Sequence, residues 1–378
     1  MRLAVGTITL VTGLLVTLGL TMLHSVGMHH RAGMSYYNQQ CVWLVVGFAA
    51  CLVAASVDYR RTRWLAWGLP GVTAILLVIA RVPPYGHLVN GAWRWIHVGG
   101  FTFQPSEFAK VALILGLAVY AQTFRRRMTE FVHGLVIPGA GASVILGLVF
   151  LGKDLGTTAL LSILAASMLF GAGTRLRHLV PVGLVGFVLL CGFLRTDPVR
   201  WRRVEAFLHP ELYGDSIALQ SIQSTIAIGA GGTYGLGLGN GVQKAGFVPE
   251  QQTDFIFSVI GEELGLQFTL PLLAAYFAFT AAALTIARRA GDMYGSMIAC
   301  GVGLVIGFQA VINIAVTTGS VPNKGLALPF VSYGGSCLVA MLTLVGLLIN
   351  VAFRSPRESA GEFLPDSEDR EASALQGV

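Results

Sequence analysis

Long apolar runs constrain this chain more than any other feature. They recur along most of the sequence, and 54% of the 378 residues are hydrophobic whereas 12% are charged. An α-helix needs about 20 apolar residues to cross the roughly 30 Å hydrocarbon core of a bilayer. The sequence therefore predicts an all-α integral membrane protein.

About ten transmembrane helices are predicted from hydropathy. They fall at 3–23, 39–57, 65–81, 104–122, 132–151, 155–173, 178–194, 255–286, 292–316 and 335–353. The first run follows Arg2 without a small-residue cleavage site, so we expect a retained helix and not a signal peptide.

Basic residues predict the orientation, because short cytoplasmic loops accumulate Lys and Arg. Alternate short loops hold Arg2, Arg60, Arg61, Arg63, Arg125, Arg126, Arg127, Arg175, Arg177, Arg288, Arg289, Arg354 and Arg357. Both termini are then expected in the cytoplasm. The net charge of +6 reflects this topology, and nucleic acid is not an expected partner.

The predicted membrane domain covers residues 1–353 and contains one large loop, and a tail follows it. About 195–254 forms a large extracytoplasmic loop before the eighth helix, with an interfacial or re-entrant helix followed by the glycine-rich stretch GGTYGLGLGNG. Residues 354–378 are polar and acidic, which predicts a disordered cytoplasmic tail.

Carboxylates carry the functional signal. The stretch PEQQTDFIFSVIGEELG places Glu250, Asp254, Glu262 and Glu263 at the mouth of an apolar helix. Acidic side chains near hydrocarbon are costly and mark functional sites by default. From the residues alone, capping of the following helix explains Asp254 as well as catalysis does.

Four segments resemble, in the same order, signature segments of the SEDS family of membrane proteins. They are WRWIHVGGFTFQPSEFAK, KDLGTT, GLGLGNGVQKAGFVPEQQTDFIFSVIGEELGL and VPNKGLALPFVSYGGSCL. The family contains the RodA, FtsW and SpoVE type peptidoglycan glycosyltransferases, and GNGVQK and PNKGLALPFVSYGG are more similar to the FtsW and SpoVE branch.

The resemblance implies a fold and an activity. The fold is a ten-helix membrane domain, and the activity is polymerisation of lipid II on the outer face of the bacterial cytoplasmic membrane, in division or cell-shape wall synthesis. Expected partners are a class B penicillin-binding protein, which supplies transpeptidation, and other divisome or elongasome membrane proteins.

The resemblance also implies residue roles. Asp254 takes the place of the family's catalytic aspartate in TDFIF. Glu107 and Lys110 match the paired charges of the QPSE segment, Arg94 matches the basic residue before it, and Asp154 matches the aspartate of DLGT.

One departure concerns the neighbourhood of Asp254. Gln252 stands where the family commonly has a histidine, so this chain lacks a histidine partner for Asp254.

The chemistry of lipid II suggests what the site must contain. An α-linked pyrophosphate is replaced by a β1,4 linkage, so one inverting displacement suffices, with a base for the acceptor hydroxyl and cations for the leaving group. We expect Asp254 to be the base. Substrate-binding candidates are Arg94, Lys110, Lys244, Lys324 and Ser332, and structural or electrostatic candidates are Glu107, Asp154, Glu250 and Glu262.

Several alternatives stay open. Glu107 and Lys110 share a helix face, which fits a scaffold as well as active-site electrostatics. No metal ligand set is visible, although a divalent cation (Mg²⁺ or Mn²⁺) near the pyrophosphate is compatible with the chemistry. A lipid-precursor flippase or transporter and a non-catalytic division scaffold are the rival functions.

Overall fold

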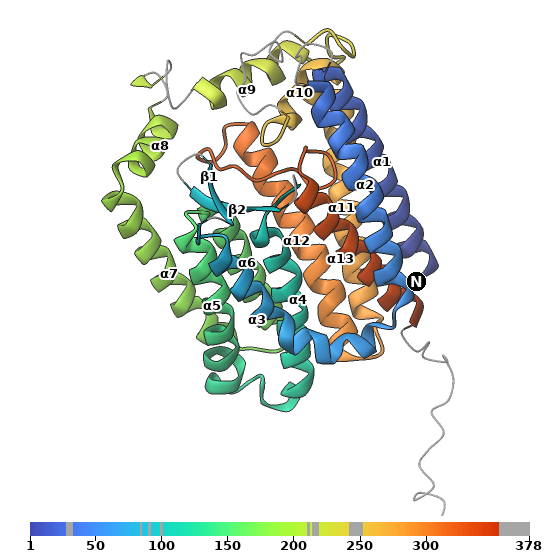
Figure 1. The fold of residues 1–378 in the computed structure, drawn as a ribbon, viewed down its shortest axis with the longest axis vertical. Coiled ribbons are helices and arrows are strands. Elements are labelled where there is room, and N and C mark those ends of the chain that lie inside the picture. The colour runs from blue at the N-terminus through green and yellow to red at the C-terminus, as the bar shows by residue number, and fades with distance from the viewer. Residues whose placement is uncertain are drawn as a thin grey trace, which may run out of the picture.

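The computed structural model describes residues 1–27, 33–83, 85–89, 92–98, 101–209, 212–213, 219–241 and 252–354, and it is mainly helical (Figure 1). The helices are α1 (Arg2–Gly27), α2 (Gly33–Ser56), α3 (Arg63–Ile79), α4 (Pro105–Thr123), α5 (Ile137–Leu151), α6 (Leu155–Gly171), α7 (Leu176–Thr196), α8 (Pro198–Leu208), α9 (Leu219–Gly231), α10 (Ile256–Leu264), α11 (Leu266–Arg288), α12 (Met293–Thr317) and α13 (Gly335–Arg354). Short 3₁₀ turns at Tyr59–Thr62 and Arg125–Arg127 and a π turn at Val132–Val136 join them.

The predicted helical membrane protein is confirmed. Within the described residues, eight helices are long and apolar enough to cross a bilayer: α1, α2, α3, α5, α7, α11, α12 and α13. The predicted spans 104–122 and 155–173 coincide with α4 and with the 17-residue apolar helix α6. A full crossing by α4 and α6 stays a prediction.

The predicted span 255–286 was wrong as one helix, because the chain breaks at Gly265. This glycine has a φ of 71° and separates α10 from α11. A side chain there would lie 2.6 Å from the carbonyl oxygen of Thr233. The left-handed conformation and the close approach of the glycine-rich stretch both require a residue without a Cβ.

A small sheet accompanies the helices. Strands β1 (Gly86–Val89), β2 (Ala92–Val98) and β3 (Phe101–Phe103) form an antiparallel sheet in the order β1-β2-β3. Aromatic and β-branched residues favour strands, and AWRWIHV in β2 is rich in them. This sheet leads directly into α4.

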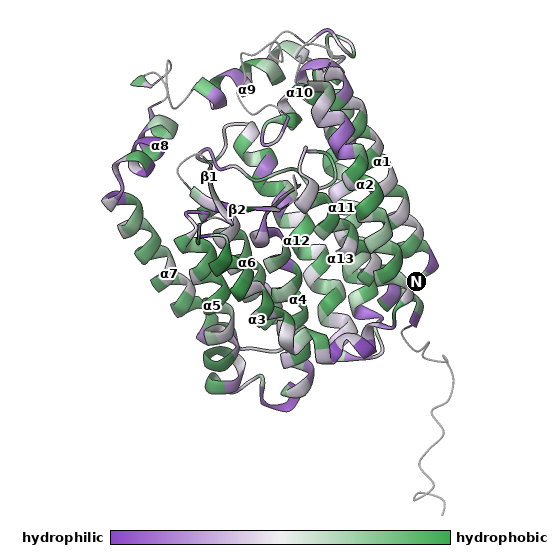
Figure 2. Ribbon diagram, viewed as in Figure 1, coloured by the Kyte–Doolittle hydropathy of each residue, from purple (hydrophilic) through white to green (hydrophobic). Residues whose placement is uncertain are grey.

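Charged and polar residues gather at the two ends of the helical bundle, and its sides are apolar (Figure 2). We call the end with β1–β3, α8 and α9 the sheet end, and the opposite end the arginine end. The amino terminus lies near the arginine end, where Arg354 at the end of α13 donates to Ser56. This placement agrees with two termini on the same side. Residues 355–378, the predicted tail, lie outside the described residues.

Burial divides the helices into a core and a periphery. Helices α4, α12 and α13 supply many of the fully buried side chains. Gly303 and Gly307 of α12 approach Ala283 and Thr280 of α11 closely, as the internal packing of a GxxxG pair predicts. By contrast, no residue of α7 is buried, and α7 lies on the flank opposite α1 and α2 (Figure 1).

The predicted helix and glycine turn are present at the sheet end. Helix α9 is followed by Gly232, Gly235, Gly237 and Gly239, all with positive φ. A Cβ at Gly235 would lie 2.2 Å from the carbonyl oxygen of Glu263. The glycine stretch is therefore needed for close backbone packing against α10.

The segment 318–334 between α12 and α13 has no helix or strand and is partly buried. Irregular backbone at such depth must find hydrogen-bond partners within the protein. Tyr276 of α11 donates to the carbonyl of Pro329 at 2.6 Å, and Gln309 of α12 donates to that of Ala327 at 2.7 Å. These bonds fix the path of the segment.

Candidate active site

Asp254 lies half-buried in the turn 252–255 that leads into α10. The N-cap residue of α10 is Phe255, one residue after the position that the sequence favoured for a cap. The Asp254 carbonyl accepts from Asn313 of α12, and its carboxylate lies against Gly325 of the 318–334 segment. The predicted residues Lys244 and Glu250 lie outside the described residues.

Lys324, next to Gly325, has a pKa lowered to about 8. Burial is the largest cause, and the positive charge of Arg203 is the next, while Asp154 opposes the shift and Arg200 and Arg94 add to it. The positive charges of Arg203 and Arg200 on α8 and of Arg94 on β2 thus all disfavour the charged form of Lys324. Mutual repulsion of this kind is relieved when an anion binds between the groups.

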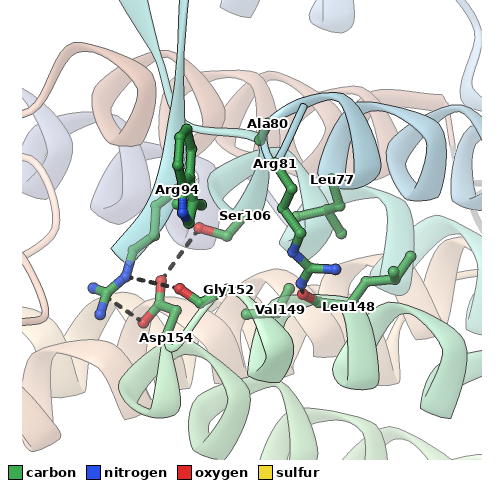
Figure 3. A pocket seen from close by; sticks show the side chains of 10 residues that line it. Leu77, Ala80, Arg81, Arg94, Ser106, Leu148, Val149, Gly152 and Asp154 are labelled. Atoms are coloured by element: carbon green, nitrogen blue, oxygen red, sulfur yellow. Dashed lines mark hydrogen bonds and ion pairs between the residues drawn. The ribbon is translucent and has the colours of Figure 1, made fainter. Parts of the chain in front are cut away.

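Arg94 of β2 and Asp154 point toward each other (Figure 3). Their closest nitrogen and oxygen atoms are 3.9 Å apart, and Arg94 also donates to the Lys153 carbonyl at 2.7 Å. Asp154 is the N-cap of α6, where it accepts from the backbone N–H and the hydroxyl of Thr157. The pair thus ties the sheet to the turn between α5 and α6.

A pocket opens beside this pair (Figure 3). It is lined by Leu77, Ala80, Arg81, Trp93, Arg94, Ser106, Leu148, Val149, Gly152 and Asp154. Arg81 points across it and donates to the Leu148 carbonyl, and burial lowers the pKa of its guanidinium. Sequence reasoning did not select Arg81.

Glu107 and Lys110 form a buried ion pair on α4. The Lys110 ammonium has no exposed surface and donates to Glu107 at 2.8 Å and to Gln309 of α12 at 2.7 Å. The predicted helix-face pairing is present, and the bond to Gln309 joins two central helices. Contact of Lys110 with a substrate stays a prediction.

Ser332 is 5% exposed, and its hydroxyl accepts from the backbone N–H of Leu328 at 2.7 Å. Its carbonyl accepts from Gln40 of α2. Both bonds shape the 318–334 segment, so the described contacts of Ser332 are structural. Its predicted role in substrate binding is untested.

Glu262 and Glu263 are both buried on α10. Glu263 accepts from the hydroxyl of Ser25 on α1, at 2.8 Å for the closer oxygen, and from the backbone N–H of Gly239 at 3.0 Å. The carboxylate of Glu262 packs against Gly241. These contacts hold the glycine stretch in place. The structural or electrostatic role of Glu262 stays a prediction.

Besides Arg81, the structure adds three residues that the sequence analysis missed. Arg200 and Arg203 of α8 act on Lys324, whereas the neighbouring Arg202 acts on Tyr213. Their spacing of three along a helix was the available signal. Asn313 had no signal beyond being a polar residue in an apolar helix.

Comparisons with known proteins agree with the fold. The family model of the FtsW, RodA and SpoVE proteins, described as "Cell cycle protein", matches residues 1–356. A probable peptidoglycan glycosyltransferase FtsW of Trichlorobacter lovleyi is 38% identical over 345 residues, which cover 89% of this chain and 90% of that protein. Stage V sporulation protein E of Bacillus subtilis is 37% identical over 353 residues, covering 91% and 96%.

Solved structures show the same fold. A chain in the structure described as "Structural coordination of polymerization and crosslinking by a peptidoglycan synthase complex" is 30% identical, with a TM-score of 0.77 and coverage of 92% of this chain and 96% of that one. RodA of Thermus thermophilus is 27% identical, with a TM-score of 0.69 and coverage of 93% and 97%. The chain is a multi-pass protein of the bacterial cytoplasmic membrane. It belongs to the FtsW, RodA and SpoVE family of peptidoglycan glycosyltransferases.

Proposed function

We propose that this protein polymerises lipid II into glycan strands at the sheet end, which faces the outside of the cell. The observation that carries the proposal is the position of the Asp254 carboxylate against Gly325, next in sequence to Lys324, on which the positive charges of three arginines act. A base beside a cationic cluster is the arrangement that displacement of a pyrophosphate requires.

Asp254 serves as the general base in this proposal. It takes the proton of the acceptor sugar hydroxyl while that oxygen attacks the anomeric carbon and the bond to the polyprenyl pyrophosphate breaks, with inversion.

The cations stabilise the departing pyrophosphate. Lys324, Arg94, Arg200 and Arg203 come from the 318–334 segment, β2 and α8. One nitrogen of Arg200, Nη1, is buried without a hydrogen-bond partner in the part of the chain that the structure describes. Guanidinium groups match phosphate oxygens in charge and geometry.

A divalent cation would bind at this site only if phosphate oxygens of the substrate completed its coordination. Among the described residues, no three His, Cys, Asp or Glu side chains lie close enough to hold a metal. Mg²⁺ is commonly held by one or two carboxylates plus substrate phosphates, so Asp254 or Asp154 would be its protein ligand here. Bound there, the ion would neutralise charge on the pyrophosphate.

A class B penicillin-binding protein is the proposed partner, together with other membrane proteins of the division or elongation machinery. The support is the likeness to a chain of a peptidoglycan synthase complex that is described as coordinating polymerization and crosslinking. Relatives named FtsW and SpoVE favour a role in division or sporulation.

The decisive experiment is polymerisation of purified lipid II by the protein with its partner. Asp254→Asn should lower the rate by about 10²–10⁴-fold, the usual contribution of a general base. Asp58→Asn is the matched control, because Asp58 lies at the arginine end, where it pairs with Arg354. If Asp254→Asn forms polymer at the wild-type rate, Asp254 is not the general base.

The same preparation separates the rival functions. Transfer of labelled lipid II across vesicle membranes without polymer formation would favour a flippase. A non-catalytic scaffold would make no polymer in the wild type and would support growth with Asp254→Asn.

A further inference from the structure

The turn that carries Asp254 is held through its backbone on both sides of the aspartate. The Asp254 carbonyl accepts from the side-chain amide of Asn313 at 2.8 Å. The Gln252 carbonyl accepts from the backbone N–H of Tyr333 at 2.9 Å. Neither bond uses the Asp254 carboxylate, so these two backbone contacts fix the turn independently of that group.

Asn313 joins this turn to the 318–334 segment. Its Nδ2 donates to the carbonyl of Leu326 at 2.6 Å as well as to that of Asp254. The residue is 1% exposed and lies on α12, four residues from Gln309, which holds the same segment one turn deeper. One buried amide therefore sets the spacing between the aspartate and the segment that carries Lys324.

The spacing is tight where the two segments meet. A Cβ on Gly325 would lie 2.5 Å from Oδ2 of Asp254. Gly325 and Leu326 are consecutive, so the bond from Asn313 to Leu326 acts directly beside this contact. A small shift of either segment would change the position of the carboxylate.

Asn313 also lowers the folding stability in one respect. Its Oδ1 is buried and has no hydrogen-bond partner within the described residues. An unsatisfied buried acceptor costs folding free energy, and such groups in native structures call for an explanation. The explanation here is that the same amide holds the carbonyls of Asp254 and Leu326.

We propose that Asn313 is a positioning residue for Asp254, which it holds at a fixed distance from the Lys324 segment. The role rests on the proposed function, because positioning matters only if Asp254 is the base. Asn313 itself does not touch the substrate. A general base must lie within hydrogen-bond reach of its proton, and a misplacement of about 1 Å can lower a rate by about 100-fold.

The test compares two buried asparagines. Asn313→Leu removes the amide with little change in volume. Asn350→Leu is the control, since Asn350 is also 1% exposed and makes four hydrogen bonds, but at the arginine end of α13. We expect kcat to fall by about 100-fold in Asn313→Leu, with the KM for lipid II close to wild type. Asn350→Leu should lose thermal stability with kcat retained.

Two further measurements distinguish positioning from general damage. Hydrogen exchange, which needs no substrate, should increase at 252–258 and 324–328 in Asn313→Leu and not in Asn350→Leu. Asp254→Asn should also cost less activity in the Asn313→Leu background than in the wild type, because coupled residues are not additive.

The outcomes are separable from those of the proposed function. A wild-type kcat in Asn313→Leu, unchanged exchange at both segments, or full additivity with Asp254→Asn would overturn the positioning role. If Asp254→Asn alone retains activity, the assignment of Asp254 as the base fails. Hydrogen exchange would still report whether Asn313 holds the turn.

Discussion

Replacement of Gly325 by alanine should displace the reactive carboxylate and leave the fold intact. The new Cβ would lie 2.5 Å from Oδ2 of Asp254, whereas non-bonded atoms prefer about 3.5 Å. The carboxylate must therefore retreat by about 1 Å. A displacement of this size corresponds to about 100-fold in kcat, or about 2.7 kcal/mol in activation free energy.

Stability should hardly change, because the group that moves is the carboxylate at the end of a flexible side chain and not a part of the backbone. Gly325 is exposed and has no positive φ, so alanine fits its backbone. Gly229→Ala is the control, since a Cβ there on α9 meets nothing within 4 Å. Lipid II polymerisation gives kcat and KM, and thermal unfolding gives stability. A wild-type kcat in Gly325→Ala, or a loss matched by a large fall in melting temperature, would refute the reasoning.

Two further predictions concern charged side chains. The Lys324 ammonium, with a pKa of about 8, loses its proton as the pH rises through that value, so the KM for lipid II should rise between about pH 7 and pH 9. Lys324→Arg should abolish this rise, and an equal rise in both proteins would assign it to another group. Lys110→Met leaves Glu107 buried without its cation and should lower stability by about 3–5 kcal/mol, whereas adding Glu107→Leu should restore much of it. Glu107→Ala should reduce thermal stability more than lipid II binding, and the reverse ranking would place Glu107 in the active site.

Hydropathy located the predicted spans well because a bilayer imposes one length on every crossing helix. It failed at Gly265, where 255–286 reads as one apolar run but contains a break. The glycine itself was the readable sign of a helix end. The sheet at 86–103 was missed because its short strands lie between two spans, where a loop was expected.

Part of the site could be predicted because Asp254, Arg94, Asp154 and Lys324 lie in recognisable motifs. Their grouping with Arg200 and Arg203 depends on where α8 lies in the fold, which no local pattern shows. The role of Asn313 could not be predicted from the sequence for a similar reason. Its partners lie 59 and 13 residues away in the chain and are backbone groups, so no side-chain chemistry marks them.

The bonds from α12 have a consequence for how sequences of this kind can vary. Gln309 and Asn313 donate to the carbonyls of Ala327, Leu326 and Asp254, and every amino acid offers that same acceptor. These three bonds therefore form whatever side chains stand at the accepting positions. Two amides on one helix fix the backbone beside Lys324 and Gly325, and the side chain at position 324, which makes none of these bonds, stays open to selection for the substrate.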